Sequence, residues 1–209
     1  METEEHPYFT TGKLPRRPNP ETGEPRPPRA PRVSKKEVPT PRNQKIRKHP
    51  DGPPAEYGPR LEWRQQSAVG VLTSGALAFA FLLVVCLLFA GSDAVTLWFM
   101  WLIYIVTGAL VALAAHKDWI AAGAGWLQNR NTWVNTYELV EVKIGAASAS
   151  QTLKLKDLAG QYTEVKLRDA QENPDLWDLV YNGMLHSAVN GKVNVSPGHR
   201  KILGLPEPG

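Results

Sequence analysis

The residue types that most often carry catalysis or bind metals are scattered along this 209-residue chain. The one cysteine, Cys86, lies inside an apolar run, so no intramolecular disulfide can form. A protein metal site needs several ligands at short, regular spacings. The histidines have no such spacing: they are His6, His49, His116, His186 and His199.

Four carboxylates lie close together towards the C-terminus, at Asp169, Glu172, Asp175 and Asp178. They surround the predicted start of a helix, where negative side chains complement the positive end of the helix dipole. Ser187 lacks the glycine-flanked turn of a nucleophile elbow, and the chain contains no glycine-rich phosphate loop. The sequence therefore predicts no enzyme, no metal site and no cofactor.

The elements that must position any functional residues of the chain are two uncharged apolar runs, residues 67–90 and 94–115. Each is longer than the ~20 residues that an α-helix needs to cross the hydrocarbon core of a bilayer. The turn at 91–93 is too short to let two helices diverge, so we expect an antiparallel transmembrane hairpin over residues 60–115. No charged side chain lies inside either span, which argues against an ion or proton pathway.

Basic residues flank this hairpin at one end only. Arg47, Lys48, Arg60 and Arg64 lie before the first span, Lys117 and Arg130 follow the second span, and the turn has none. The positive-inside rule then predicts that both termini lie in the cytoplasm, at a bacterial inner membrane. Small residues at helical spacing predict a helix-packing face, either inside the hairpin or between two copies of the chain: Gly70, Ser74, Ala78, Gly108 and Ala112.

The arm before the hairpin, residues 1–59, holds most of the prolines and the excess of positive charge. Proline defeats helices and central strands, and the arm has few apolar residues to bury, so we expect it to be disordered. It is either a solvated tether or a contact for anionic lipid, an acidic protein or, with less support, nucleic acid. The candidate contacts are Lys35, Lys36, Arg42, Lys45, Arg47 and Lys48.

Residues 116–130 follow the second span. Trp119 and Trp126 share one helical face with other apolar residues, which favours an amphipathic helix in the membrane interface. The alternative is a linker whose tryptophans anchor at head-group level and contact lipid or a partner. We therefore assign this stretch as an interfacial segment.

Residues 131–191 predict a small cytoplasmic α+β domain. Alternating apolar residues predict antiparallel strands over 139–144, 151–156 and 162–167. Asn173 and Pro174 begin an amphipathic helix that stops near Gly191, and residues 192–209 form a tail. Trp177 and Tyr181 lie one turn apart on this helix, where they either anchor a partner or pack onto the sheet.

The stretches 132–142, 153–160 and 176–187 resemble those of a bacterial pleckstrin-homology-like domain. Together with the spans, they also resemble small two-span membrane proteins of actinobacteria. The resemblance covers residues 67–191 and implies a fold without implying an activity. Because 131–191 is short for a seven-stranded barrel, an abbreviated sheet closed by a C-terminal helix is the alternative.

The function that we expect is a non-enzymatic membrane adaptor, which presents a small domain to protein or lipid partners. The protein partner is another protein or a second copy of this chain. One alternative is an accessory subunit of a secretion, conjugation or respiratory assembly in the membrane. Another is a membrane tether that holds nucleic acid through the basic arm.

Overall fold

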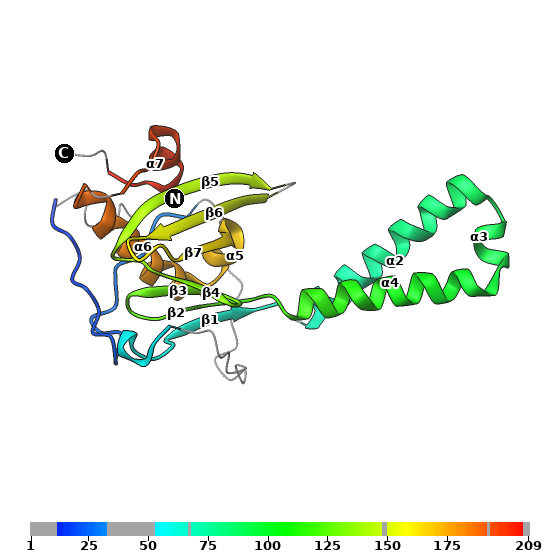
Figure 1. Ribbon diagram of the computed structural model, residues 1–209, viewed down its shortest axis with the longest axis horizontal. Helices are drawn as coiled ribbons and strands as arrows, with labels where there is room; N and C mark the ends of the chain where they lie inside the picture. Colours follow the sequence, from blue (N-terminus) through cyan, green and yellow to red (C-terminus); the bar gives the residue numbers. More distant parts are fainter. Residues whose placement is uncertain (1–11, 33–52, 67, 148–149, 192, 207–209) are drawn as a thin grey trace. The chain divides into compact units, whose positions relative to one another are not determined.

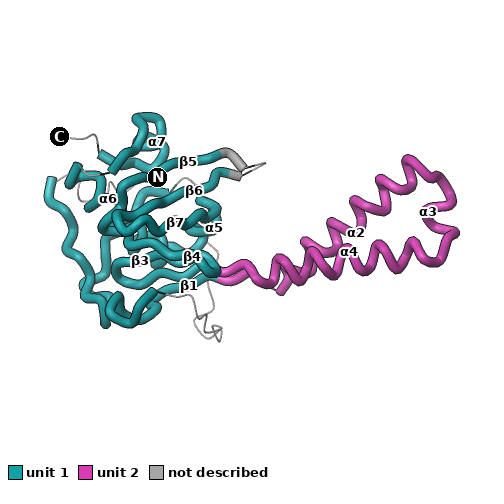
Figure 2. The backbone as a smooth tube through the Cα atoms, in the orientation of Figure 1, with its two compact units in different colours: residues 1–64, 120–209 teal, residues 65–119 magenta. Residues whose placement is uncertain are grey.

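The computed structural model describes residues 12–32, 53–66, 68–147, 150–191 and 193–206. It divides into two compact units (Figure 2). Unit 1 combines residues 1–64 with residues 120–209, and unit 2 is the stretch between them, residues 65–119. In the chain, unit 2 is therefore an insertion within the sequence of unit 1.

Unit 2 consists of two long apolar helices and a short one at the turn between them (Figure 1). These are α2 (Ala68–Ala90), α3 (Asp93–Thr96) and α4 (Trp98–His116). The most apolar windows of α2 and α4 have mean hydropathies of 2.6 and 2.0, and only 6% and 11% of these windows are buried. At 1.5 Å per residue both helices are long enough to cross a bilayer.

The contact between α2 and α4 is made where glycines face each other. A Cβ added to Gly75 would lie 2.8 Å from the carbonyl oxygen of Gly108 and 3.0 Å from Cβ of Ala112. Gly70, Ser74 and Ala78 are half-buried on the same side of α2 as Gly75. Of the predicted packing face, Gly108 and Ala112 therefore lie at this contact, where Gly75 of α2 faces them.

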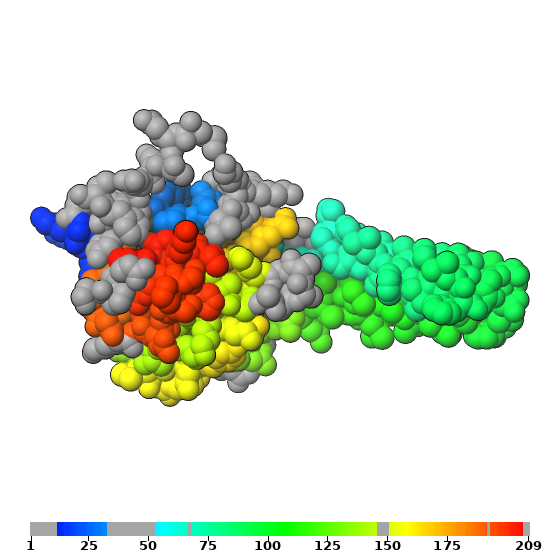
Figure 3. All heavy atoms as spheres, turned by 90° about the horizontal axis from the view of Figure 1, so that it is seen from above, coloured from blue at the N-terminus to red at the C-terminus, as the bar shows by residue number. Residues whose placement is uncertain are grey.

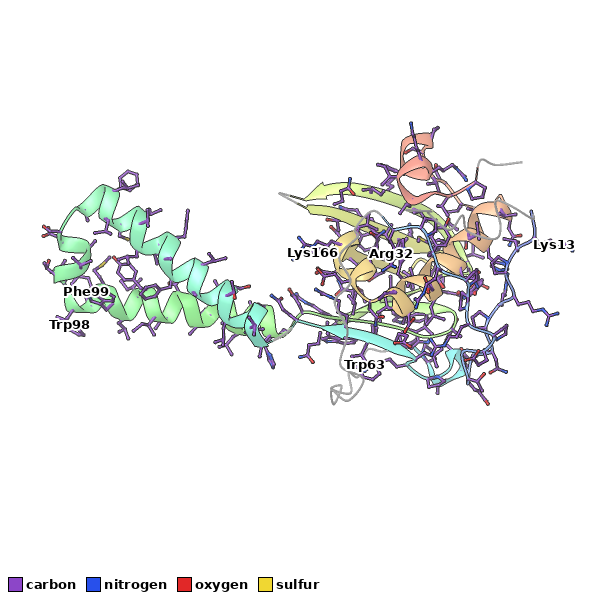
Figure 4. The ribbon with its side chains drawn as sticks, turned by 180° about the vertical axis from the view of Figure 1, so that it is seen from behind. Lys13, Arg32, Trp63, Trp98, Phe99 and Lys166 are labelled. Carbon is purple, nitrogen blue, oxygen red and sulfur yellow. The ribbon has the colours of Figure 1, made fainter. Side chains whose placement is uncertain are left out.

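Aromatic side chains fill the other end of the hairpin, near its turn. Phe79 of α2 lies 5.9 Å from the ring of Tyr104, whose hydroxyl donates a hydrogen bond to the Ala94 carbonyl over 3.0 Å. Trp98 and Phe99 also lie at this end, where Trp98 is 78% exposed (Figure 4). The turn is therefore fixed by ring packing together with the short helix α3.

Unit 1 contains two antiparallel sheets and several helices, which confirms a small antiparallel-sheet domain with helices. One sheet has the strand order β1-β2-β3-β4 and the other β5-β6-β7, so consecutive strands are neighbours throughout. The strands are β1 (Glu62–Gln65), β2 (Trp119–Ala122), β3 (Trp126–Asn129), β4 (Thr132–Asn135), β5 (Leu139–Ala147), β6 (Ser150–Asp157) and β7 (Tyr162–Lys166).

The second sheet follows the predicted alternation. Ile144 of β5 pairs with Leu153 of β6, which pairs with Val165 of β7. Leu153 and Val165 are buried, whereas their neighbours Lys154 and Glu164 are partly exposed. A period of two puts every second side chain on the core face, which is why these strands were readable from the sequence.

The first sheet corrects the interfacial segment. Residues 119–122 and 126–129 are strands in place of an amphipathic helix, with Ala122 paired to Leu127. Trp126 and Leu127 are both buried, so these strands belong to the core of unit 1. Strands of four residues, joined by a run of glycine and alanine, are too short for a period of two to stand out.

Three helices complete unit 1 together with a 3₁₀ turn, η1 (Ala55–Tyr57). The helices are α5 (Leu167–Glu172), α6 (Pro174–Val189) and α7 (Pro197–Leu203). The predicted tail is folded over residues 193–206. Its Asn194 accepts a hydrogen bond from the Val142 amide and donates one to the Val140 carbonyl, so the tail extends the edge of β5.

Residues 12–32, which we call the strap, also belong to unit 1. They are extended except for a turn in which the Asn19 amide donates to the Glu24 carbonyl. Figure 3 shows the strap in blue on the surface of unit 1. The disorder expected over residues 1–59 therefore does not hold for the strap, whose polar backbone groups find partners on α6. The rest of the arm up to residue 52 lies outside the described residues.

Candidate interaction surface

Helix α6 is the centre of unit 1. Asn173 caps it by accepting hydrogen bonds from the amides of Asp175 and Leu176, and Pro174 occupies its first turn. Thirteen consecutive residues, from Leu176 to Ala188, are buried. An amphipathic helix lying on a sheet would leave one face in water, so a second element must cover the outer face of α6.

The strap is that element (Figure 4). At the N-terminal half of α6, the Arg29 guanidinium donates to Asp175 over 2.9 Å and to Asp178 over 2.8 Å. The other oxygen of Asp178 accepts the Ala30 amide over 2.9 Å. The indole of Trp177 donates to the Pro31 carbonyl over 2.8 Å. One carboxylate and one indole thus hold three consecutive strap residues.

The C-terminal half of α6 holds the other end of the strap. Asn182 donates its side-chain amide to the Arg16 carbonyl, over 3.3 Å, and to the Tyr137 hydroxyl, over 2.8 Å. Nε2 of His186 lies 2.8 Å from the Pro15 carbonyl. Because a carbonyl only accepts, this nitrogen carries the proton. The strap therefore runs antiparallel to α6 and is held at both ends.

These contacts have the chemistry of polyproline recognition. A polyproline helix has no internal hydrogen bonds, so its carbonyls are free to accept from a receptor. Aromatic-lined grooves use such carbonyls to bind extended proline-rich segments. Here Trp177, Asn182 and His186 donate to three strap carbonyls, and Arg29 adds a charged anchor. The outer face of α6 thus holds the extended strap through donors that meet its backbone carbonyls and through one charged pair.

Burial sets the charge states at this surface. It raises the pKa of Asp178 to about 6, although the Ala30 amide and the Arg29 guanidinium act in the opposite direction. Burial also lowers the pKa of His186, against the hydrogen bond to Pro15. At neutral pH the outer face of α6 therefore presents an ionised Asp178 to Arg29 and a neutral His186 to the strap carbonyl.

The four clustered carboxylates have partners that the sequence does not reveal. Asp169 lies 3.5 Å from the Arg64 guanidinium, and Glu172 accepts from the same side chain. Asp175 and Asp178 both bind Arg29. Helix capping and the dipole explain the positions of all four in the sequence, whereas Arg64 and Arg29 are the partners of the two that are buried, Glu172 and Asp178.

Among the residues that the structure describes, two hollows include side chains of the strap in their lining. One, about 500 Å³, is lined by residues that include Arg17, Tyr137, Leu139 and Ser187; a smaller one, about 340 Å³, lies at the Arg29 contact. The Ser187 hydroxyl is engaged, since it donates to the Thr136 carbonyl and accepts the Leu139 amide. No group of three metal-ligating side chains occurs in the described ranges.

The predicted contact residues fall into different places. Trp126, Trp177 and Tyr181 are buried inside unit 1, and Trp119 is half-buried. The Tyr181 hydroxyl donates to the Gly204 carbonyl, which joins α6 to the end of α7. The predicted basic contacts, Lys35, Lys36, Arg42, Lys45, Arg47 and Lys48, lie outside the described residues.

Sequence reasoning missed Arg29, Asn182 and His186 as members of one surface. A signal was present in the polar positions of α6, because Asp175, Asp178, Asn182 and His186 recur at steps of three and four. No protein-family model matches the chain, and neither a curated protein nor a solved structure is similar to it.

Proposed function

We propose that the chain is a non-enzymatic membrane adaptor, in which α2 and α4 span a bilayer and unit 1 is the interaction domain. The observation that carries this proposal is the exposure of the two helices. Large apolar side chains such as Leu72, Phe81 and Leu88 are at least 70% exposed. Exposing many such side chains to water is costly, whereas hydrocarbon accommodates them.

The flanking charges support a cytoplasmic location for unit 1. Arg64 and Lys117 lie at the two ends of the stretch that forms unit 2, and the turn carries only Asp93. By the positive-inside rule, the basic ends of the hairpin stay on the cytoplasmic side of a bacterial inner membrane, and the turn is carried to the opposite side. Both chain termini then lie on the cytoplasmic side.

The strand order supports the pleckstrin-homology-like resemblance. A four-stranded meander, a three-stranded meander and a following helix make seven strands closed by a helix. Two sheets of this kind suit a barrel more than the abbreviated sheet that was the alternative. In this reading the hairpin is inserted between the first and second strands, so both of its ends tie the domain to the membrane.

Cysteine labelling tests the membrane topology. In a Cys86→Ser chain, Ser92→Cys places a thiol at the hairpin turn and Asn190→Cys places one on an exposed residue of unit 1. A membrane-impermeant maleimide added to spheroplasts should label Ser92→Cys, and should label Asn190→Cys only after lysis. Labelling of both before lysis, or recovery of the chain in the soluble fraction, would refute the topology.

Crosslinking followed by purification in mild detergent tests the adaptor function itself. We expect a defined protein partner or a second copy to be recovered with the full chain. Recovery of monomer alone, with no preference among lipids, would contradict the proposal.

The second candidate is an accessory subunit of a larger membrane assembly. The observation in its favour is that the contact between α2 and α4 uses one face of each helix and leaves the others exposed. Those faces are free to pack against foreign helices. A stoichiometric complex that persists through purification would distinguish this candidate from a free adaptor.

A further inference from the structure

The strap is bound by groups that do not depend on its continuity with unit 1. Its hydrogen bonds and ion pairs to α6 use backbone carbonyls, one backbone amide and one arginine side chain, and Ala30 adds an apolar contact with the core cluster. Only four of its 21 residues, Pro18, Gly23, Pro27 and Ala30, are buried. Segments with few buried apolar contacts open at lower free energy than the core, so we expect release of the strap to require less free energy than unfolding of the sheets.

Release of the strap exposes a face of α6 whose polar side chains have lost hydrogen-bond partners. Trp177 and His186 lose their acceptors, Asn182 keeps only the Tyr137 hydroxyl, and Asp178 loses both of its donors. Covering these groups again with a surface that offers no partners is unfavourable, because a buried donor or acceptor then loses its water without a replacement. The face is therefore best covered by another extended segment that carries proline carbonyls and an arginine at the matching spacing.

A second copy of this chain carries such a segment by definition. Twenty residues, 33–52, connect the strap to Pro53 in the sequence. Fully extended, they reach at most about 70 Å, which is several times the ~16 Å that the strap covers along α6. Exchange of identical elements between copies keeps every native contact and needs no new interface.

We propose that the outer face of α6 is a receptor site for a Pro–Arg-rich extended segment, and that the strap of a second copy occupies it in trans. The inference names the partner of the proposed adaptor, and it rests on that function because confinement to a membrane raises the local concentration of copies. Two chains that exchange straps form a closed pair in which each supplies Arg29 to the Asp178 of the other.

The contact between Pro31 and Gly204 makes the exchange measurable. A Cβ built on Gly204 lies 3.4 Å from Cβ of Pro31, close to the mean Cβ separation of ~3.8 Å in disulfides. Two differently tagged full-length chains, both Cys86→Ser, are co-expressed, one with Pro31→Cys and the other with Gly204→Cys. Mild oxidation of the membranes and a non-reducing gel then report disulfides between the two tags.

We expect a disulfide-linked pair that contains both tags. Replacing Pro31→Cys by Thr22→Cys, on the exposed turn of the strap, should abolish it. Adding Arg29→Glu to the Pro31→Cys chain should reduce it about tenfold or more, because a charge-assisted pair becomes repulsive.

One chain that carries both cysteines is the positive control. If this chain closes its internal disulfide while the mixed chains form none, the strap binds only in cis and the exchange is refuted. If neither forms, the strap does not bind α6 and the receptor site is refuted as well. Both outcomes are independent of the labelling at Ser92 and Asn190, so the failure of this inference and the failure of the membrane topology are distinguishable.

Discussion

The raised pKa of the Asp178 carboxyl group predicts how the free energy of unfolding changes with pH. Burial raises its pKa in the folded chain to about 6, from 3.8 in the unfolded chain. Between these values the folded chain binds more protons than the unfolded chain, so the free energy of unfolding falls as pH rises from about 4 to about 6. The difference of about two pKa units corresponds to roughly 3 kcal/mol, at 1.36 kcal/mol per unit.

The perturbation is Asp178→Asn, which keeps an acceptor for the Ala30 amide and cannot ionise. Urea unfolding in mild detergent, followed by tryptophan fluorescence from pH 4 to pH 7, gives the free energy of unfolding of both chains. We expect the wild type to lose up to about 3 kcal/mol relative to Asp178→Asn across this range. His186 titrates nearby in the opposite sense, but it is present in both chains and cancels in the difference.

The sign of this difference decides between two effects. A wild type that gains stability relative to Asp178→Asn as pH rises would mean that the ion pair with Arg29 outweighs burial. The reasoning from burial would then be wrong. In an Arg29→Ala background the loss should grow, because the cation that holds the pKa of Asp178 down is gone.

Three further predictions concern other parts of the fold. Gly75→Leu should separate α2 from α4, because the leucine side chain would meet the Gly108 carbonyl. Crosslinking between the two helices should then decrease. Ala76→Leu, on the exposed side of α2, should leave this crosslinking unchanged. Asn173→Ala should lower the free energy of unfolding by about 1 kcal/mol through loss of the α6 cap, as read by urea unfolding. Arg64→Met should lower the free energy of unfolding by roughly 3 kcal/mol in the same assay, because it leaves Glu172 buried without its main partner. Arg168→Met, which removes a 63% exposed side chain, should lower it by less than ~1 kcal/mol.

The elements that the sequence predicts well are long and periodic. The apolar run of α2 spans 23 residues, and the cap and proline of α6 are local signals that need no knowledge of the rest of the chain. The strands β1 and β2 have four residues each and are separated in the sequence by unit 2. A pairing across such an insertion leaves no local pattern, and β3 and β4 are equally short, so none of the four strands of this sheet was predicted.

The receptor face of α6 was missed for a related reason. Arg29 and Asp178 are far apart in the sequence, and composition alone assigns the strap to a disordered arm. Such a segment becomes ordered when buried side chains elsewhere accept and donate to its backbone. The sequence indicates no role for Asn182 and His186 of α6, because their partners in the strap are backbone carbonyl groups. Every residue has such a group, so the partner leaves no signal in the sequence.

The arrangement of the strap also fixes an order of events during synthesis. The strap leaves the ribosome early, whereas His186 is added about 150 residues after Arg32. At typical rates of translation this takes about 8 to 30 s. The nascent strap therefore has no α6 of its own chain to bind while the hairpin and both sheets are synthesised. Its prolines keep it from pairing as a strand during this time. A finished copy beside the ribosome already carries a folded α6, so the first receptor that a new strap meets can belong to an older chain.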